Sequence, residues 1–340
     1  MQRQGDKRTN TNTDTDESRK RKRSRSMCRR CERPTPQACI CAALPRYFCS
    51  KDDASLIDER IRLQHCHCVV LEHPHEIKHK NRSLPIVKLC LHPQSITTIT
   101  SRQFPSTSID DVESNNDHPF KKLDRNIRQS LLDSKKPVWL MYHTDTQQSR
   151  GPGEAKYPTS ISLSEALTTL RNQQLPHVTV VLIDATWKYA KEMYRRSLQH
   201  FPKHMVHVHI DIATDILCLR PESNVDKDQE QHRDASTKTK YEFKPRRFDI
   251  RTPPSDQHLS TAESLAITVH SIEAELRRSH PESHTDTGLS MKGNDHNKDV
   301  DIYATMMKPL DLMVEQWHSF AKQREISGDK LRVIARTPVT

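Results

Sequence analysis

One run of six residues, Val-Thr-Val-Val-Leu-Ile at 178–183, restricts the fold of this chain more than any other feature. Such a short, almost wholly apolar and β-branched run is typical of a strand buried on both faces, which occurs in parallel sheets covered by helices. Two further apolar runs predict strands over 65–71 and 138–142. Hydrophobic residues at helical spacing predict helices over 162–172, 186–198, 260–276 and 302–320. Because strands alternate with helices, we predict an α/β protein with a mostly parallel sheet flanked by helices.

The segments between these elements are strongly polar. Hydrophobic residues make up 33% of the chain and charged residues 29%, which is too polar for a chain folded from end to end. We predict a disordered basic tail at 1–26, a single domain at 27–325 and a C-terminal tail at 326–340. Within the domain we predict three disordered insertions, at 103–118, 221–240 and 279–298.

The charge balance favours an anionic partner. Lys and Arg number 54 against 44 Asp and Glu, a formal net charge of +10. The basic run at 19–25 suits a nuclear address, an electrostatic contact with RNA, or a solvated charge run, and the sequence leaves these alternatives open. No stretch approaches the ~18 uncharged apolar residues of a membrane span, and no apolar core of a secretory signal is present. We therefore expect a soluble protein of the nucleus, the cytoplasm or both.

The positions of the six glycines argue against two common nucleotide-binding motifs, because none follows an apolar strand in the pattern of a loop that cradles phosphates. Neither a P-loop nor a dinucleotide fingerprint is therefore expected.

Four of the nine cysteines form a tight cluster, Cys28-x2-Cys31-x7-Cys39-x-Cys41. Four thiolates at this spacing can close a tetrahedral shell around Zn²⁺, and such a structural site supplies ~10–16 kcal/mol of apparent binding energy. A closed shell implies no catalytic water. The alternative is four unligated cysteines in a hydrophilic loop. A second group, His65-Cys66-His67-Cys68, alternates along a predicted strand, so its histidines and cysteines face opposite ways and are not expected to share an ion.

The end of the strand at 178–183 carries the most informative polar residues. Asp184 lies at the junction between that strand and the next helix, where open α/β sheets place ligands. Asp184, Thr186 and Trp187 offer a proton acceptor, a hydrogen-bonding group and a stacking face. The alternative is that Asp184 or Thr186 caps the helix while Trp187 packs in the core.

Two other motifs lie where a ligand could reach them. His73-Pro74-His75-Glu76 follows the first predicted strand, and its proline forces a turn, so it is either part of a ligand site or a turn of exposed polar residues. Ser260-Thr261-Ala262-Glu263 has the spacing of a capping box at a helix start. Arg251 precedes it, and a cation near a helix N-terminus could hold a carboxylate or phosphate, or could simply be solvated.

Taken in chain order, these motifs resemble the DTW-domain family of tRNA-uridine aminocarboxypropyltransferases. The resemblance covers about Cys28 to Phe320 and rests on the cysteine cluster, His73-Pro74-x-Glu76, Asp184-x-Thr186-Trp187 and Ser260-Thr261-x-Glu263. It implies a SPOUT-like fold with a knotted C-terminal segment that binds S-adenosylmethionine. It also implies transfer of the 3-amino-3-carboxypropyl group to N3 of a uridine in tRNA, with methylthioadenosine as by-product.

The resemblance also suggests roles for the site residues. Asp184 would take the N3 proton, Thr186 would orient the base or the donor, and Trp187 would stack on a ring or wall the pocket. For binding S-adenosylmethionine we expect His73, Glu76, Arg251, Ser260, Thr261 and Glu263. By charge alone, Arg251 suits the carboxylate of the donor, and Glu76 or Glu263 its ammonium group. For Glu263 the capping box is a competing role.

The sequence departs from the family pattern at three places: Ala185 replaces the usual Gly, Asn81-Arg82-Ser83 replaces Asn-Thr, and Met141-Tyr142-His143 lacks a proline. Two other functions stay open, the first because of these departures and the second because a related enzyme class with a similar fold acts on a ribosomal RNA base. One is a non-catalytic, zinc-bearing RNA-binding protein, and the other is aminocarboxypropyl transfer to ribosomal RNA. In each case the basic tail and the arginines of the cysteine loop would contact RNA phosphates.

Overall fold

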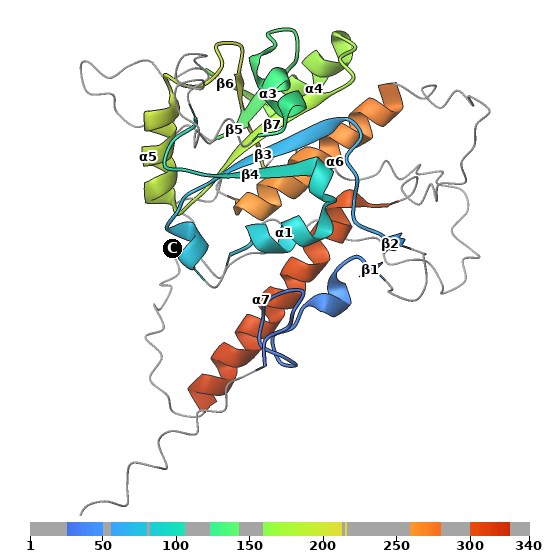
Figure 1. Ribbon diagram of the computed structural model, residues 1–340, viewed down its shortest axis with the longest axis vertical. Coiled ribbons are helices and arrows are strands. Elements are labelled where there is room, and N and C mark those ends of the chain that lie inside the picture. The colour runs from blue at the N-terminus through green and yellow to red at the C-terminus, as the bar shows by residue number, and fades with distance from the viewer. Residues whose placement is uncertain are drawn as a thin grey trace, which may run out of the picture. The chain divides into compact units, whose positions relative to one another are not determined.

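The computed structural model in Figure 1 describes residues 26–49, 56–79, 82–105, 123–142, 159–212, 215, 259–279 and 300–326. The chain divides into two compact units, Met1–Cys39 and Ile40–Thr340. Nearly all of the predicted tails, at 1–26 and 326–340, lie outside the described residues. The same holds for the predicted insertion at 221–240, for all but the first residue of that at 279–298, and for all but the first three of that at 103–118.

Six parallel strands form a central sheet in the second unit, in the order β4-β3-β7-β5-β8-β6. The strands are β3 (Cys66–Glu72), β4 (Ile96–Thr100), β5 (Val138–Met141), β6 (Ser160–Ser162), β7 (Val178–Asp184) and β8 (Val206–His209). The predicted strands correspond to β3, β5 and β7 within one residue at each end. A separate antiparallel hairpin pairs β1 (Tyr47–Cys49) with β2 (Leu56–Asp58).

Helices cover both faces of the sheet (Figure 1). On one face, α3 (Arg125–Leu132) and α5 (Trp187–Ser197) pack on a buried cluster that includes Leu71, Leu140 and Val181. On the other face, α6 (Thr261–Ser279) contacts β3 and β7. The remaining α-helices pack around α6: α1 (Leu84–Cys90), α4 (Leu163–Asn172) and α7 (Ile302–Ile326). The predicted α/β architecture with a parallel sheet flanked by helices is therefore confirmed.

The alternation of side chains along β3 explains how both faces are covered. Successive side chains of a strand point to opposite faces of the sheet, so odd- and even-numbered residues of β3 face different helices. Leu71 lies in the buried cluster under α5. Cys66 points the other way, toward α6, and its Sγ lies 3.6 Å from a carboxylate oxygen of Glu273. The helix α6 is buried on most of its circumference, because the sheet and other helices enclose it. Within the described residues, no helix is long and apolar enough to cross a membrane.

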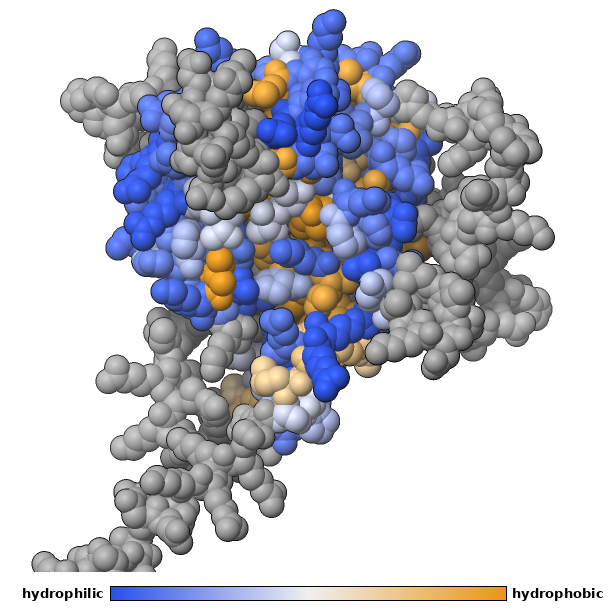
Figure 2. All heavy atoms as spheres, viewed as in Figure 1, coloured by the Kyte–Doolittle hydropathy of each residue, from blue (hydrophilic) through white to orange (hydrophobic). Residues whose placement is uncertain are grey.

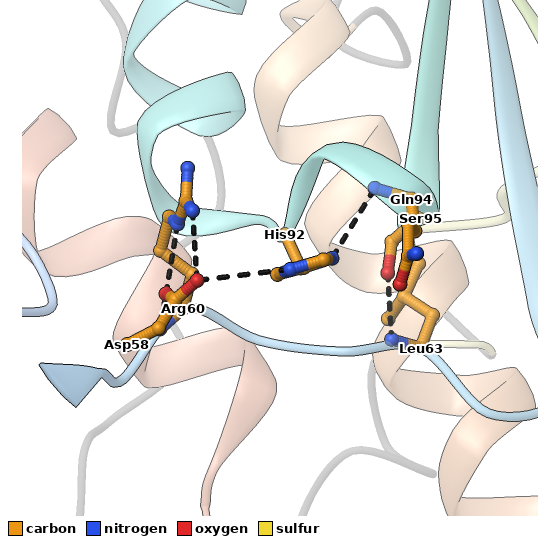
Figure 3. A network of polar contacts seen from close by, with 6 residues as sticks. All are labelled: Asp58, Arg60, Leu63, His92, Gln94 and Ser95. Atoms are coloured by element: carbon orange, nitrogen blue, oxygen red, sulfur yellow. Dashed lines mark hydrogen bonds and ion pairs between the residues drawn. The ribbon is translucent and has the colours of Figure 1, made fainter. Parts of the chain in front are cut away.

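A polar network supports β4 at the edge of the sheet (Figure 3). Arg60 donates two hydrogen bonds of 2.8 and 2.7 Å to the carboxylate of Asp58, at the end of β2. Nδ1 of His92 accepts the backbone N–H of Gln94 at 3.3 Å, so a neutral ring carries its proton on Nε2, which lies 3.7 Å from Asp58. The network thus joins the end of the hairpin to the short helix η3 (Pro93–Ser95) that immediately precedes β4.

The chain order reverses between β3 and β7. From β3 the chain continues through α1 to β4 on one side, whereas from β7 it continues through α5 to β8 on the other side. In open parallel sheets, ligands bind outside the carboxyl ends of the strands at such a reversal. Glu72 and Asp184 end these two strands and are partners in their register. Residues 216–258, which lead toward α6, lie outside the described residues, and the knot stays a prediction.

Candidate functional site

Asp184 is the centre of the candidate site. Its side chain is buried, and the Thr261 side chain at the first residue of α6 hydrogen-bonds its carboxylate. The Oδ2 atom of Asp184 has no hydrogen-bond partner among the described residues. The pKa of Asp184 is raised to about 6, above all by burial and to a smaller extent by nearby Glu76 and Glu72, while Thr261 and Arg82 oppose the shift. A carboxyl group with a pKa this close to neutrality is suited to accept a proton at physiological pH.

The site contains two charged residues that the sequence analysis did not predict, Glu72 and Arg82. Glu72 is buried and forms an ion pair with Arg82, which lies between β3 and α1. The backbone oxygen of Glu72 also accepts the N–H of Ser101, just after β4. The signal for Glu72 was present in the sequence, because it directly follows a predicted strand just as Asp184 does. Nothing in the sequence marks Arg82 as its partner.

His73, one of the predicted site residues, contacts Asp184 through its backbone and α5 through its ring. Its N–H donates to the backbone oxygen of Asp184 at 3.0 Å, and its buried ring stacks on Tyr189 of α5 with centroids 4.4 Å apart. Nδ1 of His73 accepts the N–H of His75 at 3.2 Å. Burial, followed by the nearby His75 and Arg102, lowers the pKa of His73, so its ring is neutral at pH 7. His73 therefore anchors α5 to the end of β3 and adds no charge to the site.

Glu76 is also buried, at the start of the short helix η2 (Glu76–Lys78). It lies close enough to Asp184 to raise the pKa of that carboxyl. The interpretation of 73–76 as a turn of exposed polar residues is therefore wrong for His73 and Glu76, and it holds for His75.

Thr186 and Trp187 connect the site to α5. Thr186 occupies the N-cap position of α5, but its side chain makes no capping hydrogen bond. Trp187, the first residue of the helix, is 40% exposed. Thr186 therefore does not cap the helix through its hydroxyl, and Trp187 does not pack in the core.

The start of α6 carries the predicted capping box. The N–H of Ser260 donates to Oε2 of Glu263 at 3.0 Å, and the N–H of Glu263 donates to Oγ of Ser260 at 3.2 Å. Glu263 therefore has a structural partner, and its contact with a donor ammonium stays a prediction. Arg251 lies outside the described residues. The structure thus brings Glu76, Asp184 and Thr261 together, while the capping box lies beside them on α6.

We expect Ser260→Ala to lower the free energy of unfolding by about 1 kcal/mol, because it removes a side-chain cap from α6. The matched variant is Ser162→Ala, which removes the same bond from the capping box of α4. Denaturant titration of both variants measures the loss. A stability loss confined to Ser162→Ala would contradict the capping role of Ser260.

The four cysteines of the N-terminal loop lie close enough to hold one metal ion. Their sulfur atoms all lie within 4.8 Å of one another, and Sγ of Cys31 and Sγ of Cys39 are 3.8 Å apart. Four thiolates around Zn²⁺ at ~2.3 Å would be separated by ~3.8 Å, so the donor set fits a tetrahedral site. A turn brings the first pair together: the N–H of Glu32 donates to the backbone oxygen of Cys28 at 2.9 Å. Within the described residues, no other group of histidines, cysteines and carboxylates has this geometry.

The fold thus defines an α/β protein in which the buried carboxyl groups of Glu72, Glu76 and Asp184 gather at the carboxyl edge of a parallel sheet. The chain belongs to the DTW-domain family, whose pattern matches residues 25–318. It is 25% identical over 175 residues to tRNA-uridine aminocarboxypropyltransferase A of Arabidopsis thaliana. That alignment covers 50% of this chain and 51% of the relative, so the chain spans about half the length of the relative it matches. No solved structure matches the chain significantly.

Proposed function

We propose that this protein transfers the 3-amino-3-carboxypropyl group of S-adenosylmethionine to N3 of a uridine in tRNA. The family membership and the named relative support a tRNA-modifying transferase. The observation that carries the finer assignment is Asp184, a buried carboxyl group with a raised pKa at the point where the strand order reverses.

The charges around Asp184 suit a cationic donor. Glu72, Glu76 and Asp184 supply three carboxylates, and Arg82 supplies one guanidinium group. S-adenosylmethionine carries a sulfonium and an ammonium group, both of which are attracted by a site with excess negative charge. The exposed indole of Trp187 offers a surface for the target base or the donor adenine.

In the proposed step, N3 of the uridine attacks the donor carbon next to sulfur. A carbon–nitrogen bond forms, the carbon–sulfur bond breaks, and its electron pair returns to sulfur, which leaves as neutral methylthioadenosine. The N3 proton passes to the carboxylate of Asp184, so no acid is needed for the leaving group. Much of the acceleration would come from holding nitrogen, carbon and sulfur in line.

The test uses purified full-length protein, unmodified tRNA and two preparations of S-adenosylmethionine, labelled in the methyl or in the aminocarboxypropyl carbons. We expect label from the aminocarboxypropyl carbons on a uridine, located by digestion and mass spectrometry. Methyl label on the RNA would overturn the proposed reaction. Transfer to ribosomal RNA in place of tRNA would move the function to the ribosome, and binding without transfer would favour a non-catalytic RNA-binding protein.

The turnover rate should depend on pH through Asp184. Since the pKa of this carboxyl is raised to about 6, the carboxylate required as a base is lost as pH falls through that value. With both substrates saturating, we expect the rate to be level above about pH 7 and to fall about tenfold per pH unit well below 6. A rate that stays level down to pH 5 would contradict the role of Asp184 as base.

Three further assignments belong to this proposal. The sheet would be of the SPOUT-like type, with a knot in the C-terminal segment. The ion held by Cys28, Cys31, Cys39 and Cys41 would be Zn²⁺, whose closed shell stabilises the loop and takes no part in transfer. The protein would act in the nucleus, the cytoplasm or both.

A further inference from the structure

The outer face of α5 carries a row of cations beside the candidate site. With about 100° of rotation per residue, Lys191, Arg195 and Lys188 fall at about 40°, 80° and 100° from Trp187 around the helix. All four side chains are exposed. The buried residues fall on the opposite arc: Ala190, Met193, Tyr194 and Ser197. We call Lys188, Lys191 and Arg195 the α5 cationic face.

Glu192, the acidic residue of α5, forms an ion pair with a residue outside the α5 cationic face. Glu192 pairs with Arg196 at 2.8 Å, farther around the helix. Lys191 and Arg195 stand four residues apart, where like charges destabilise a helix, and Lys188 lies in the first turn, where the helix dipole disfavours a cation. The position of Lys188 therefore does not serve helix stability, whereas Arg195 lies in the last turn, where the helix dipole favours a cation. Figure 2 shows the surface over α5, on the left of the view, as almost entirely hydrophilic.

The start of the α5 cationic face is fixed next to Asp184. Lys188 lies four residues after Asp184 in the chain, and the following residue, Tyr189, stacks on His73 at the end of β3 with an interplanar angle of 7°. Nδ1 of His75 also lies 3.3 Å from the hydroxyl of Tyr189. These contacts hold the first turn of α5 rigidly against the strand end, so the cations continue outward from the rim of the site.

We propose that the α5 cationic face docks the RNA backbone that flanks the target nucleotide. This inference rests on the proposed function, because it names the surface through which the RNA substrate reaches the same site. A row of three cations on a rigid helix matches a row of phosphates, and the exposed indole of Trp187 at its end offers a stacking surface for an unpaired base.

The test measures the affinity of the full-length protein for unmodified tRNA as a function of salt concentration. One triple variant carries Lys188→Gln, Lys191→Gln and Arg195→Gln. The matched control carries Lys88→Gln, Lys308→Gln and Lys322→Gln, which remove the same charge from exposed positions on α1 and α7. Glutamine keeps the helix propensity close to that of lysine and arginine. Thermal unfolding confirms that each variant is folded.

We expect the first variant to bind tRNA about 10- to 100-fold more weakly near 0.15 M salt, and its log–log salt slope to fall by about 2. Its turnover at saturating tRNA should stay within about twofold of the unaltered protein, because the chemistry lies at Asp184. The control should bind tRNA within about threefold of the unaltered protein.

Two results would overturn the proposed surface: equal weakening of both triple variants, or unchanged binding by the α5 variant. The proposed reaction fails separately. If the unaltered protein binds tRNA through α5 yet transfers nothing, the docking surface holds and the transferase assignment is lost.

Discussion

Replacing Asp184 with asparagine should lower the turnover number by about 10²- to 10⁴-fold, because the variant has no group to accept the N3 proton. Asparagine keeps the size of the side chain and can still accept a hydrogen bond from Thr261. Affinity for S-adenosylmethionine should fall much less than turnover, because Glu72 and Glu76 still supply negative charge to the site. Single-turnover transfer and donor binding by calorimetry separate the two effects.

The same substitution should stabilise the fold at pH 8. A carboxyl whose pKa is raised on folding favours the folded state most at low pH, and this contribution is lost as pH rises through about 6. Above that value the ionised, buried carboxylate of Asp184 opposes folding, by on the order of 3 kcal/mol for a shift of about two pKa units. Asp184→Asn removes this cost, so its denaturation midpoint should exceed that of the unaltered protein at pH 8 and approach it near pH 4.

A matched control is Asp133→Asn. Asp133 ends α3 and accepts the N–H of Lys135 at 3.0 Å, at the opposite edge of the sheet where β5 begins. We expect unchanged turnover and no stabilisation at pH 8. Full transfer by Asp184→Asn with normal donor binding would rule out a base role for this carboxyl group.

Loss of the metal site is the second large effect. The protein as isolated should contain one Zn²⁺ per chain, held by Cys28, Cys31, Cys39 and Cys41. Because such a site supplies ~10–16 kcal/mol to a segment without a core, Cys39→Ala should lose the ion and leave the loop unfolded. Metal analysis by mass spectrometry and limited proteolysis between residues 26 and 41 measure both consequences.

The control for this experiment is Cys90→Ala, which removes a buried thiol that lies outside the cluster. It should keep the full metal content while losing some stability in the core of α1. Absence of bound metal from the unaltered protein, isolated without chelator, would contradict the zinc assignment. So would normal metal content in Cys39→Ala.

The strongest sequence predictions concern elements that carry their own signal. The strand β7 was predictable because a strand buried on both faces must be apolar throughout. The helix α6 was predictable from its length, its periodicity and its capping box. In contrast, β8 and β6 have only four and three residues, and they become strands because neighbours offer them hydrogen bonds. Short segments of this kind are decided by pairing and not by local preference.

Some residues of the candidate site could likewise be predicted from the sequence, whereas others are recognised only in the tertiary structure. Sequence alone made Asp184 a candidate, because ligands bind near the carboxyl ends of strands in open parallel sheets. It also identified the four cysteines, whose spacing already limits how far apart their thiols can be. Only the tertiary structure placed Glu72 beside Asp184, because that requires the register between β3 and β7, strands more than 100 residues apart in the chain. The ion pair of Glu72 with Arg82 and the raised pKa of Asp184 follow from that placement, since burial and neighbouring charges exist only once the strands have paired.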